Sequence, residues 1–467
     1  MKPNIIVVFT DQQRWDTLGC YGQSLGVSPH LDQMAEHGVI FTNAFTCQPV
    51  CGPARSIMQT GLYASETGCF RNGIALHPRH KTVAQYLSEE GYKVGYIGKW
   101  HLASDDLFFR EKIADKRVYR KRAIPPILRG GYKDYWVASD VLEHTSTPFE
   151  GHLFNGQMEK VEFKGYRVDE LTKFALGFLE QSKESQPFFL FLSYLEPHQQ
   201  NNFPNDHHFV GPEGSKEKFK DFQVPGDLEG KEGNWRENYA EYLGCCHSID
   251  QNVKRIEKKL KELGLTENTY IIYMSDHGCH FRTRNKEYKR SCHESSIHIP
   301  LILKGPLFQE SQRLSELVST VDIPATILDL AGIPIPENFR GNSLAKLYQG
   351  RSESWKEEIF IQISESQVGR ALRTDKWKYS VKAPYRLGVF HKNSALYMEE
   401  FLYDLEKDPY ERHNLVKDPS HASLRKELAQ TLRAKIHEIE GIEATIIPWT
   451  PRWKRIRYFL NFFRKIE

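Results

Sequence analysis

Short apolar runs alternate with helical patterns through the first three quarters of the chain. The runs are rich in Ile, Val, Leu and Phe and comprise residues 5–9, 94–97, 188–193, 270–274 and 299–303. Continuous apolar runs of this length are typical of strands that are buried on both faces, and the segments between them can form covering helices. The pattern predicts an α/β fold, with a large mixed, mostly parallel sheet covered by helices on both faces.

Some helix boundaries are legible in the same pattern. We expect a helix over residues 31–37, with Ser28 as its cap and Pro29 at its first position. Residues 201–238 are rich in Gly, Pro, Lys and Asp and have little periodicity, which predicts a long surface excursion. The next helix is expected to begin near Tyr239.

Towards the C-terminus the pattern changes. It predicts short strands at residues 359–363 and 377–381 and one long helix at residues 424–439. We place a domain boundary near Ser354. This divides the chain into a first domain of residues 1–354 and a smaller α+β domain of residues 355–467. The final segment, residues 449–467, mixes aromatic with basic side chains. We favour a terminal helix that packs on its own domain over a contact with a neighbouring subunit or a membrane surface.

Composition narrows the class of protein. The chain has 467 residues, of which 40% are apolar and 26% charged, as expected for a globular protein. A net charge of +3 is too small to indicate nucleic acid as a partner. The sequence enters its first apolar run at Ile5 without a signal-peptide pattern, and no stretch approaches the roughly 18 apolar residues that cross a bilayer. We therefore expect a cytoplasmic protein without a transmembrane segment. The eight cysteines have neither a disulfide-scaffold density nor a zinc-binding spacing.

Four of the apolar runs are followed directly by polar clusters. The clusters begin at Thr10, Gly98, Glu196 and Ser275, and they contain Asp11 and Gln12, Lys99 and His101, His198, and Asp276 and His277. Taken alone, each cluster is better explained by turn chemistry or by a structural histidine. Because open α/β sheets place their sites at the carboxyl ends of strands, the four together indicate one site. Asp11, Gln12 and Asp276 offer oxygen ligands suited to Ca²⁺ or Mg²⁺, while His277 offers a nitrogen that such ions use less readily.

Residues 51–61 carry the most specific motif, CGPARSIMQTG. This segment resembles the formylglycine signature of type I sulfatases, C-x-P-S/A-R followed by x-x-x-L-T-G. Cys51, Pro53, Ala54, Arg55, Thr60 and Gly61 match the signature, while Gln59 stands where Leu is usual. The alternative interpretation is a buried structural cysteine before a helix. The strand-end clusters favour the resemblance, which extends over nearly the whole chain.

The resemblance implies an alkaline-phosphatase-like fold whose smaller C-terminal domain contains an antiparallel sheet. It implies that a maturation enzyme converts Cys51 to 3-oxoalanine, which is formylglycine. It also implies a divalent cation, Ca²⁺ with Mg²⁺ or Mn²⁺ as alternatives, bound by Asp11, Gln12, Cys51, Asp276 and His277.

The family's catalytic residues correspond to six positions of this sequence: Cys51, Arg55, Lys99, His101, His198 and Lys289. As the resemblance implies, Arg55 would hold the aldehyde hydrate, while Lys99 and Lys289 would bind the sulfate oxygens. His198 would protonate the leaving oxygen. His101 would take a proton from the second hydroxyl of the hydrate and so release sulfate.

A basic loop beside the second metal pair contains Arg282 and Arg284. Either it binds an anionic substrate or it is a solvated charged loop, and the sequence does not favour one interpretation. The leading hypothesis is a sulfatase that acts on a sulfated small molecule, more specifically a sulfated carbohydrate, and that could form a homo-oligomer. The alternatives are a phosphonate or phosphate ester hydrolase of the same superfamily and a non-catalytic module that binds sulfated glycans.

Overall fold

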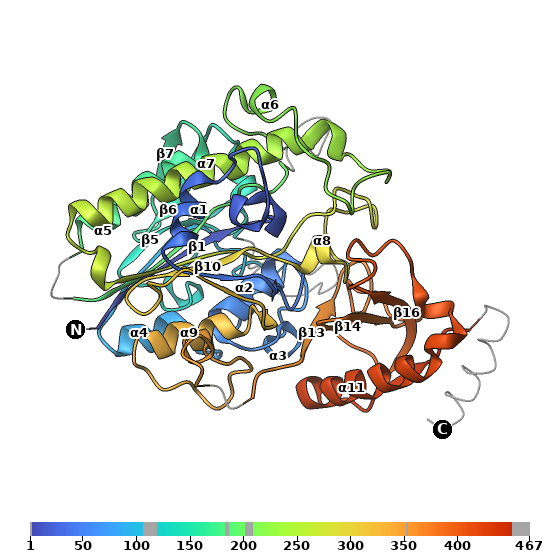
Figure 1. The fold of residues 1–467 in the computed structure, drawn as a ribbon. Helices are drawn as coiled ribbons and strands as arrows, with labels where there is room; N and C mark the ends of the chain where they lie inside the picture. Colours follow the sequence, from blue (N-terminus) through green and yellow to red (C-terminus); the bar gives the residue numbers. More distant parts are fainter. Residues whose placement is uncertain (1, 106–118, 183–185, 201–208, 352–353, 451–467) are drawn as a thin grey trace.

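A computed structural model describes residues 2–105, 119–182, 186–200, 209–351 and 354–450 (Figure 1). The largest sheet among the described residues has ten strands. Its strands, in spatial order, are β11 (Gln312–Leu314), β2 (Val39–Phe41), β10 (Leu301–Lys304), β9 (Thr269–Ser275), β1 (Asn4–Thr10), β8 (Phe188–Ser193), β4 (Lys93–Lys99), β5 (Tyr135–Ser139), β6 (Glu150–Asn155) and β7 (Lys160–Lys164).

The centre of this sheet is parallel and its margins are mixed. Strands β9, β1, β8, β4 and β5 pair parallel to one another. On one side β10 pairs antiparallel with β9 and β2, and on the other β6 pairs antiparallel with β5 and β7. The expected mixed, mostly parallel sheet is confirmed, and all five apolar runs contribute strands to it. The carboxyl ends of β9, β1, β8 and β4 meet at one edge.

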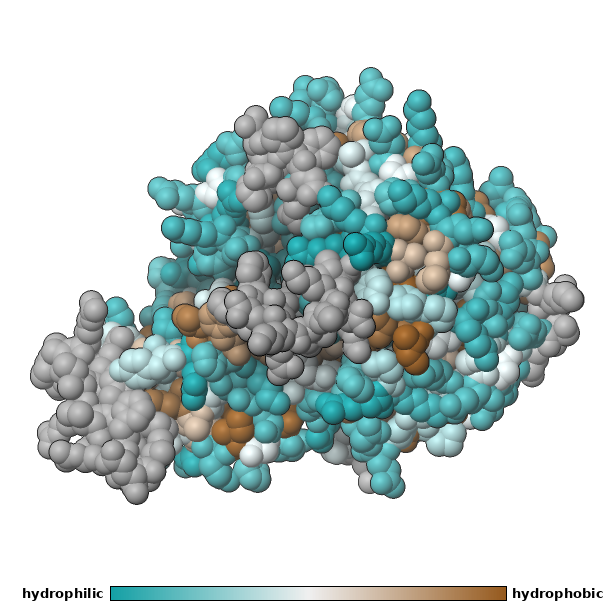
Figure 2. Space-filling model, turned by 180° about the vertical axis from the view of Figure 1, so that it is seen from behind, coloured by the Kyte–Doolittle hydropathy of each residue, from teal (hydrophilic) through white to brown (hydrophobic). Residues whose placement is uncertain are grey.

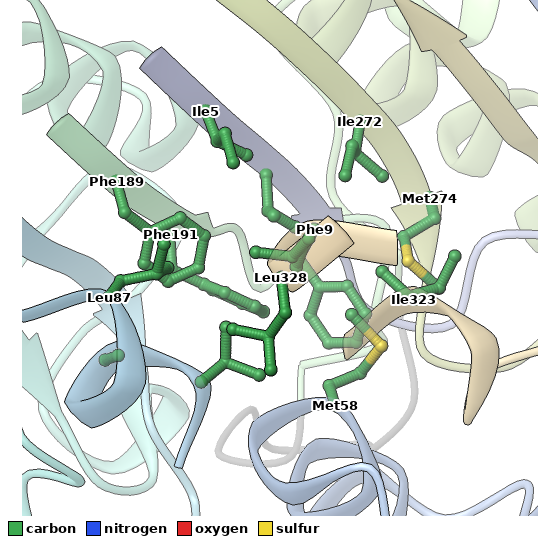
Figure 3. Packing of buried hydrophobic residues seen from close by; sticks show 14 of the residues in the cluster. Ile5, Phe9, Met58, Leu87, Phe189, Phe191, Ile272, Met274, Ile323 and Leu328 are labelled. Atoms are coloured by element: carbon green, nitrogen blue, oxygen red, sulfur yellow. The ribbon is translucent and has the colours of Figure 1, made fainter. Parts of the chain in front are cut away.

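Helices cover both faces of the sheet, and the side chains of β1 show why. Ile5, Val7 and Phe9 belong to one buried cluster, shown in Figure 3, while Ile6 and Val8 belong to another on the opposite face. The first face packs against α2 (Cys51–Thr60), α4 (Val83–Glu89) and α9 (Asp322–Leu330). The opposite face packs against α1 (Pro29–Glu36), α5 (Arg167–Glu180) and α7 (Trp235–Glu262) (Figure 1). Burial on both faces explains the uninterrupted apolar runs.

Short elements complete the first part of the molecule. A two-stranded sheet pairs β3 (Ala44–Phe45) with β12 (Val318–Ser319). The remaining helices of this part are α3 (Ala64–Thr67), α6 (Ser215–Lys218), α8 (Glu294–Ile297) and α10 (Leu344–Tyr348).

The structure confirms Ser28 at the N-cap position of α1 and Pro29 as its first residue, but the Ser28 side chain makes no capping hydrogen bond. Its hydroxyl accepts from the N–H of Gly19, and the N–H groups of His30 and Leu31 donate to the carboxylate of Asp250 on α7. A cap supplied from another helix leaves no local signal. The long helix α7 begins at Trp235, earlier than the expected start near Tyr239, because the Trp235 ring is buried in an aromatic cluster with residues of the preceding excursion.

A five-stranded sheet follows, formed by β13 (Glu358–Ile363), β14 (Gly369–Thr374), β15 (Trp377–Lys382), β16 (Leu396–Asp404) and β17 (Thr445–Ile447). It is antiparallel except for the parallel pair of β16 and β17. Helix α11 (Ala422–Glu440) packs on it through Leu428, Leu432, Ile436 and Ile439. The expected C-terminal α+β domain with an antiparallel sheet is confirmed. The basic and aromatic tail lies outside the described residues from position 451 onwards.

The surface carries no long apolar helix among the described residues. The face drawn in Figure 2 is mainly hydrophilic, with hydrophobic residues in small groups. Within the ranges described above, no helix combines the length and the hydropathy needed to cross a membrane.

Candidate active site

The strand register brings the predicted site residues together. Thr10 at the end of β1 pairs with Ser275 at the end of β9, so Asp11 and Asp276 leave the sheet side by side. The backbone N–H of Asp276 donates to the carbonyl of Thr10, and that of Gln12 donates to Asp276 Oδ1 at 2.9 Å. Because the ladder of backbone hydrogen bonds fixes this register, the two carboxylates have little freedom to separate.

Four buried side chains from three segments form a compact cluster. The ligand atoms of Asp11, Cys51, Asp276 and His277 all lie within 4.8 Å of one another. Cys51 Sγ lies 3.4 Å from both Asp11 Oδ1 and His277 Nε2. Nδ1 of His277 contacts the carbonyl of Gly278, which only accepts, so this nitrogen carries the proton and Nε2 presents its lone pair to the cluster.

The donor set fits a divalent cation. Asp276 Oδ2 and Gln12 Oε1 are buried and have no hydrogen bond from any residue that the structure describes. Arg55 Nη2 lies 3.8 Å from Asp276 Oδ2, too far for a hydrogen bond. Because buried polar oxygens are normally hydrogen-bonded, these two oxygens are candidate ligands for a bound cation. Carboxylate and amide oxygens with one imidazole nitrogen suit Ca²⁺ or Mg²⁺ better than a soft metal ion.

Gln12, the residue after Asp11, is held in an unusual backbone conformation. Its φ is +69°, in the left-handed region that residues with a β-carbon rarely adopt. Tyr242 on α7 fixes this turn, because its hydroxyl donates to the carbonyl of Gln12 at 2.7 Å and accepts from the N–H of Arg14. Gln12 Nε2 donates to Gln199 Oε1, so Oε1 is the atom of the Gln12 amide that could bind a cation.

The two carboxylates of the cluster differ in their pKa values. Burial by itself would raise the pKa of Asp11, but Lys99, His198, Lys289 and Arg55 together lower it well below its usual value. Burial and the neighbouring charge of Asp11 raise the pKa of Asp276 to about 7. Two buried carboxylates this close compete for positive charge, and a bound cation would relieve the competition.

Cys51 occupies the first position of α2, so its thiol lies at the positive end of the helix. Lys289 Nζ donates to Cys51 Sγ at 2.9 Å. Burial and Asp11 raise the pKa of the thiol, but Lys289, Lys99 and a hydrogen bond with His198 outweigh them and bring it to about 7. The thiol is therefore polarised strongly, unlike the buried Cys47, whose pKa is raised.

Two further cations lie beneath the cluster. Lys99 Nζ lies 2.8 Å from Asp11 Oδ2. Arg55 donates to Asp11 Oδ2 at 3.0 Å, to the carbonyl of Lys99 and to the hydroxyl of Ser193. Arg55 therefore binds the carboxylate of Asp11, and its expected role of holding the aldehyde hydrate stays a prediction.

The predicted histidines flank the thiol. Nδ1 of His198 contacts the carbonyl of Gln199 at 2.7 Å and therefore carries a proton. Burial and the charge of Lys289 lower the pKa of His198. His101 has a φ of +59°, and its backbone N–H donates to the carbonyl of Asp140. Burial and the charge of Lys99 lower the pKa of His101 to about 4.

These side chains open into a cavity of about 360 Å³. Its floor includes Cys51, His101 and His198, and its other side is formed by residues 286–290 together with Arg282. Arg282 stacks its guanidinium over the ring of Tyr288 at 5.0 Å. Arg284 is not among the lining residues; it donates to the carbonyls of Tyr410 and Glu411 and so fastens the loop to the C-terminal domain.

Sequence reasoning missed several residues of the cavity wall. Glu143 lies 3.5 Å from Lys99 Nζ and four residues beyond the end of β5, so the apolar residues 136–138 were an overlooked signal for a fifth strand end. Asn72 also lines the cavity and accepts from the N–H of Gly52, but nothing in its surrounding sequence marks it.

Two family models match the chain. One described as "Sulfatase" matches residues 3–333, and one described as "N-sulphoglucosamine sulphohydrolase, C-terminal" matches residues 286–438. The domain boundary expected near Ser354 falls inside the second match and stays a prediction. An ulvan-active sulfatase of Formosa agariphila is 28% identical over 459 residues, which cover 94% of this chain and 82% of that protein.

Solved structures share the fold over nearly the whole chain. The crystal structure of the Bacteroides fragilis protein yidJ is similar with a TM-score of 0.76 at 25% identity, covering 94% of this chain and 96% of that chain. A structure of another protein, in complex with its substrate D-glucosamine-2-N,6-O-disulfate, has a TM-score of 0.74 at 21% identity and covers 94% of this chain and 99% of that chain. The latter likeness shows the fold alone.

Proposed function

Because the chain belongs to the sulfatase family, we propose that it removes sulfate from a sulfated sugar, with Cys51 converted to formylglycine and with Ca²⁺ as the cation. The observation that carries the proposal is the buried cluster of Asp11, Cys51, Asp276 and His277 beneath a polar cavity. The position of Cys51 Sγ marks where the hydroxyls of the aldehyde hydrate would lie. One of these hydroxyls would attack the sulfur atom.

Asp11, Asp276 and His277 of the cluster, together with Gln12, would hold the cation. When bound, the cation would neutralise charge on a sulfate oxygen and lower the pKa of the attacking hydroxyl. Its identity as Ca²⁺ is supported by the predominance of oxygen donors, with Mg²⁺ or Mn²⁺ as alternatives.

Lys289 and Lys99 would bind the sulfate group from two sides. Lys289 Nζ lies 2.9 Å from Cys51 Sγ, so an oxyanion attached to residue 51 falls within reach of its ammonium. Lys99 is held near the same position by its ion pair with Asp11, a residue of the cluster. Point charges fixed before the reaction stabilise the charge that develops in the transition state, and such preorganised groups contribute strongly to catalysis.

The two histidines would divide the proton transfers. His198 would give a proton to the leaving oxygen, and the substrate's negative charge would offset the neighbouring lysines that lower its pKa. His101, whose pKa of about 4 keeps it neutral, would accept a proton from the second hydroxyl. That transfer would expel sulfate and restore the aldehyde, so no water has to attack a charged ester.

The cavity supports a small anionic sugar as substrate. Its lining combines the cations Arg282, Lys286, Lys289 and Arg290 with hydrogen-bonding groups such as Asn72 and Gln199. One relative is named for its activity on ulvan, and a protein of the same fold has been solved with a disulfated glucosamine as its substrate. A polar cavity of this kind suits a hydroxylated ring better than an apolar aryl group.

The test is a panel of sulfated mono- and disaccharides together with nitrophenyl sulfate and nitrophenyl phosphonate. We expect sulfate release from at least one sugar with a higher kcat/KM than from nitrophenyl sulfate. Faster turnover of the phosphonate would support the alternative, a phosphonate or phosphate ester hydrolase. Binding of sulfated sugars without any turnover by protein that carries the aldehyde would support a glycan-binding module.

A further inference from the structure

One residue in a connection of the C-terminal sheet contacts two separate segments of the cavity wall. Glu365 lies in the connection between β13 and β14. Its Oε1 accepts from the backbone N–H of Asn72 at 2.7 Å. Its Oε2 accepts from Arg290 Nε at 2.7 Å, and Arg290 Nη2 lies 2.6 Å away. Asn72 and Arg290 both line the cavity, whereas Glu365 stands behind them.

Each partner leads directly to residue 51. Asn72 Oδ1 accepts from the N–H of Gly52 at 2.9 Å, next to the nucleophile at the start of α2. Arg290 follows Lys289, whose ammonium lies 2.9 Å from Cys51 Sγ. The Glu365 carboxylate therefore bridges the segment that carries the nucleophile and the segment that carries a sulfate-binding lysine.

The backbone at both ends of this bridge is unusual. Arg290 has a φ of +64° and Glu365 a φ of +62°, in the region that side chains with a β-carbon disfavour. Such conformations persist where surrounding contacts over-determine them, and they concentrate at functional sites. The hydroxyl of Ser366 adds a second link, since it donates to the carbonyl of Arg290 at 2.7 Å.

We propose that Glu365 is a positioning residue, which sets the distance between the Lys289 ammonium and residue 51 from outside the first domain. The inference rests on the proposed function. Glu365 touches neither the nucleophile nor the sulfate. It acts through Arg290 and Asn72, with the charge-assisted geometry that makes arginine–carboxylate pairs directional. In this view the C-terminal sheet contributes to the rate and not only to stability.

The test compares Glu365→Gln with Glu400→Gln in the full-length enzyme. Glu400 is the matched control, because it binds Lys382 of β15 and Gln367 of the connection that also carries Glu365, yet it does not line the cavity. We expect Glu365→Gln to lower kcat on nitrophenyl sulfate by about 10- to 100-fold, as loss of a supporting partner does at other sites. We also expect the variant to bind inorganic sulfate about tenfold more weakly, because the ammonium of Lys289 would be displaced. Calorimetry measures this affinity. Glu400→Gln should change neither quantity.

Two further variants separate positioning from stability. Glu365→Asp keeps the charge on a shorter side chain and should recover part of kcat. Arg290→Gln should also lower kcat, and the loss in the double variant should be smaller than the product of the two single losses, since both variants break the Arg290–Glu365 pair. Additive losses, or a Glu365→Gln enzyme with normal kcat and sulfate affinity, would overturn the inference. If Glu365→Gln does not fold, the Glu365→Asp and Arg290→Gln comparison decides. An inactive wild type with the aldehyde in place would instead contradict the proposed function.

Discussion

The floor and the mouth of the cavity are built in different ways. On the floor, Asp11 and Asp276 leave adjacent strands of one sheet, and the backbone ladder sets their separation. At the mouth, Arg282 and Arg290 lie in a loop with left-handed backbone, held by ion pairs and hydrogen bonds from the C-terminal domain. The floor therefore depends on strand register, and the mouth depends on side-chain contacts between domains. We expect changes on the floor to abolish the chemistry and changes at the mouth to tune the rate and the specificity.

The largest expected effect comes from the floor. Cys51→Ala removes the nucleophile, and we expect kcat to fall by at least about 10⁴-fold, since an essential covalent catalyst is lost. Cys47→Ala, four residues earlier in the chain and equally buried, should retain nearly normal kcat. Steady-state rates on nitrophenyl sulfate test the pair. Comparable rates for Cys51→Ala and the wild type would refute the mechanism.

The contact that supports the mouth should be costly to break. Lys378 is fully buried and its ammonium contacts Glu294, Glu411 and the carbonyl of Cys292. Lys378→Met leaves the buried carboxylate of Glu411 without its ion-pair partner, while Glu294 keeps Arg373, and we expect about 3–5 kcal/mol loss in the free energy of unfolding. Lys376→Ala, which breaks the exposed pair with Glu406, should change stability little. Denaturant titrations measure the free energy of unfolding of both variants. Equal losses would show that the buried ion pairs of Lys378 stabilise the protein no more than the exposed pair of Lys376.

Cation binding should stabilise the floor with a defined pH dependence. A cation at about 100 times its Kd should add about 2.7 kcal/mol to the free energy of unfolding. In the metal-free protein, Asp276 has a pKa of about 7. Between the ordinary pKa of an aspartate and about pH 7, the folded state therefore keeps a proton that the unfolded state has lost. The free energy of unfolding consequently falls as the pH rises through this range. The gain in Tm from Ca²⁺ over chelator should therefore be larger at about pH 8 than at about pH 5. A gain that shrinks with rising pH would contradict this picture.

The smallest effect concerns the support of Gln12. Tyr242→Phe removes the hydroxyl that bridges the carbonyl of Gln12 and the N–H of Arg14. Loss of such an outer contact should weaken cation affinity about tenfold. Tyr239→Phe on the same helix is the control, because the Tyr239 hydroxyl makes no hydrogen bond to any residue that the structure describes. Calorimetric titration measures the Ca²⁺ affinity of the two variants. Equal affinities would show that the Tyr242 hydroxyl has no role in cation binding.

The contrast between floor and mouth also explains how much of the site the sequence alone could predict. Asp11, Lys99, His198 and Asp276 each follow an apolar run, so the strand ends alone predicted that these four residues meet at one site. Cys51 needed the resemblance, because its motif has no periodicity of its own. Glu365 and the orientation of Arg284 depend on contacts across more than a hundred residues, for which a single sequence carries no local signal.

The mass of one peptide tests the central claim most directly. Trypsin should release residues 15–55, which carry position 51, from protein produced together with a formylglycine-generating enzyme. Conversion of the thiol to the aldehyde predicts a mass about 18 Da below that of the unmodified peptide. A peptide found only with its thiol intact, from a preparation that nonetheless hydrolyses sulfate esters, would contradict the account.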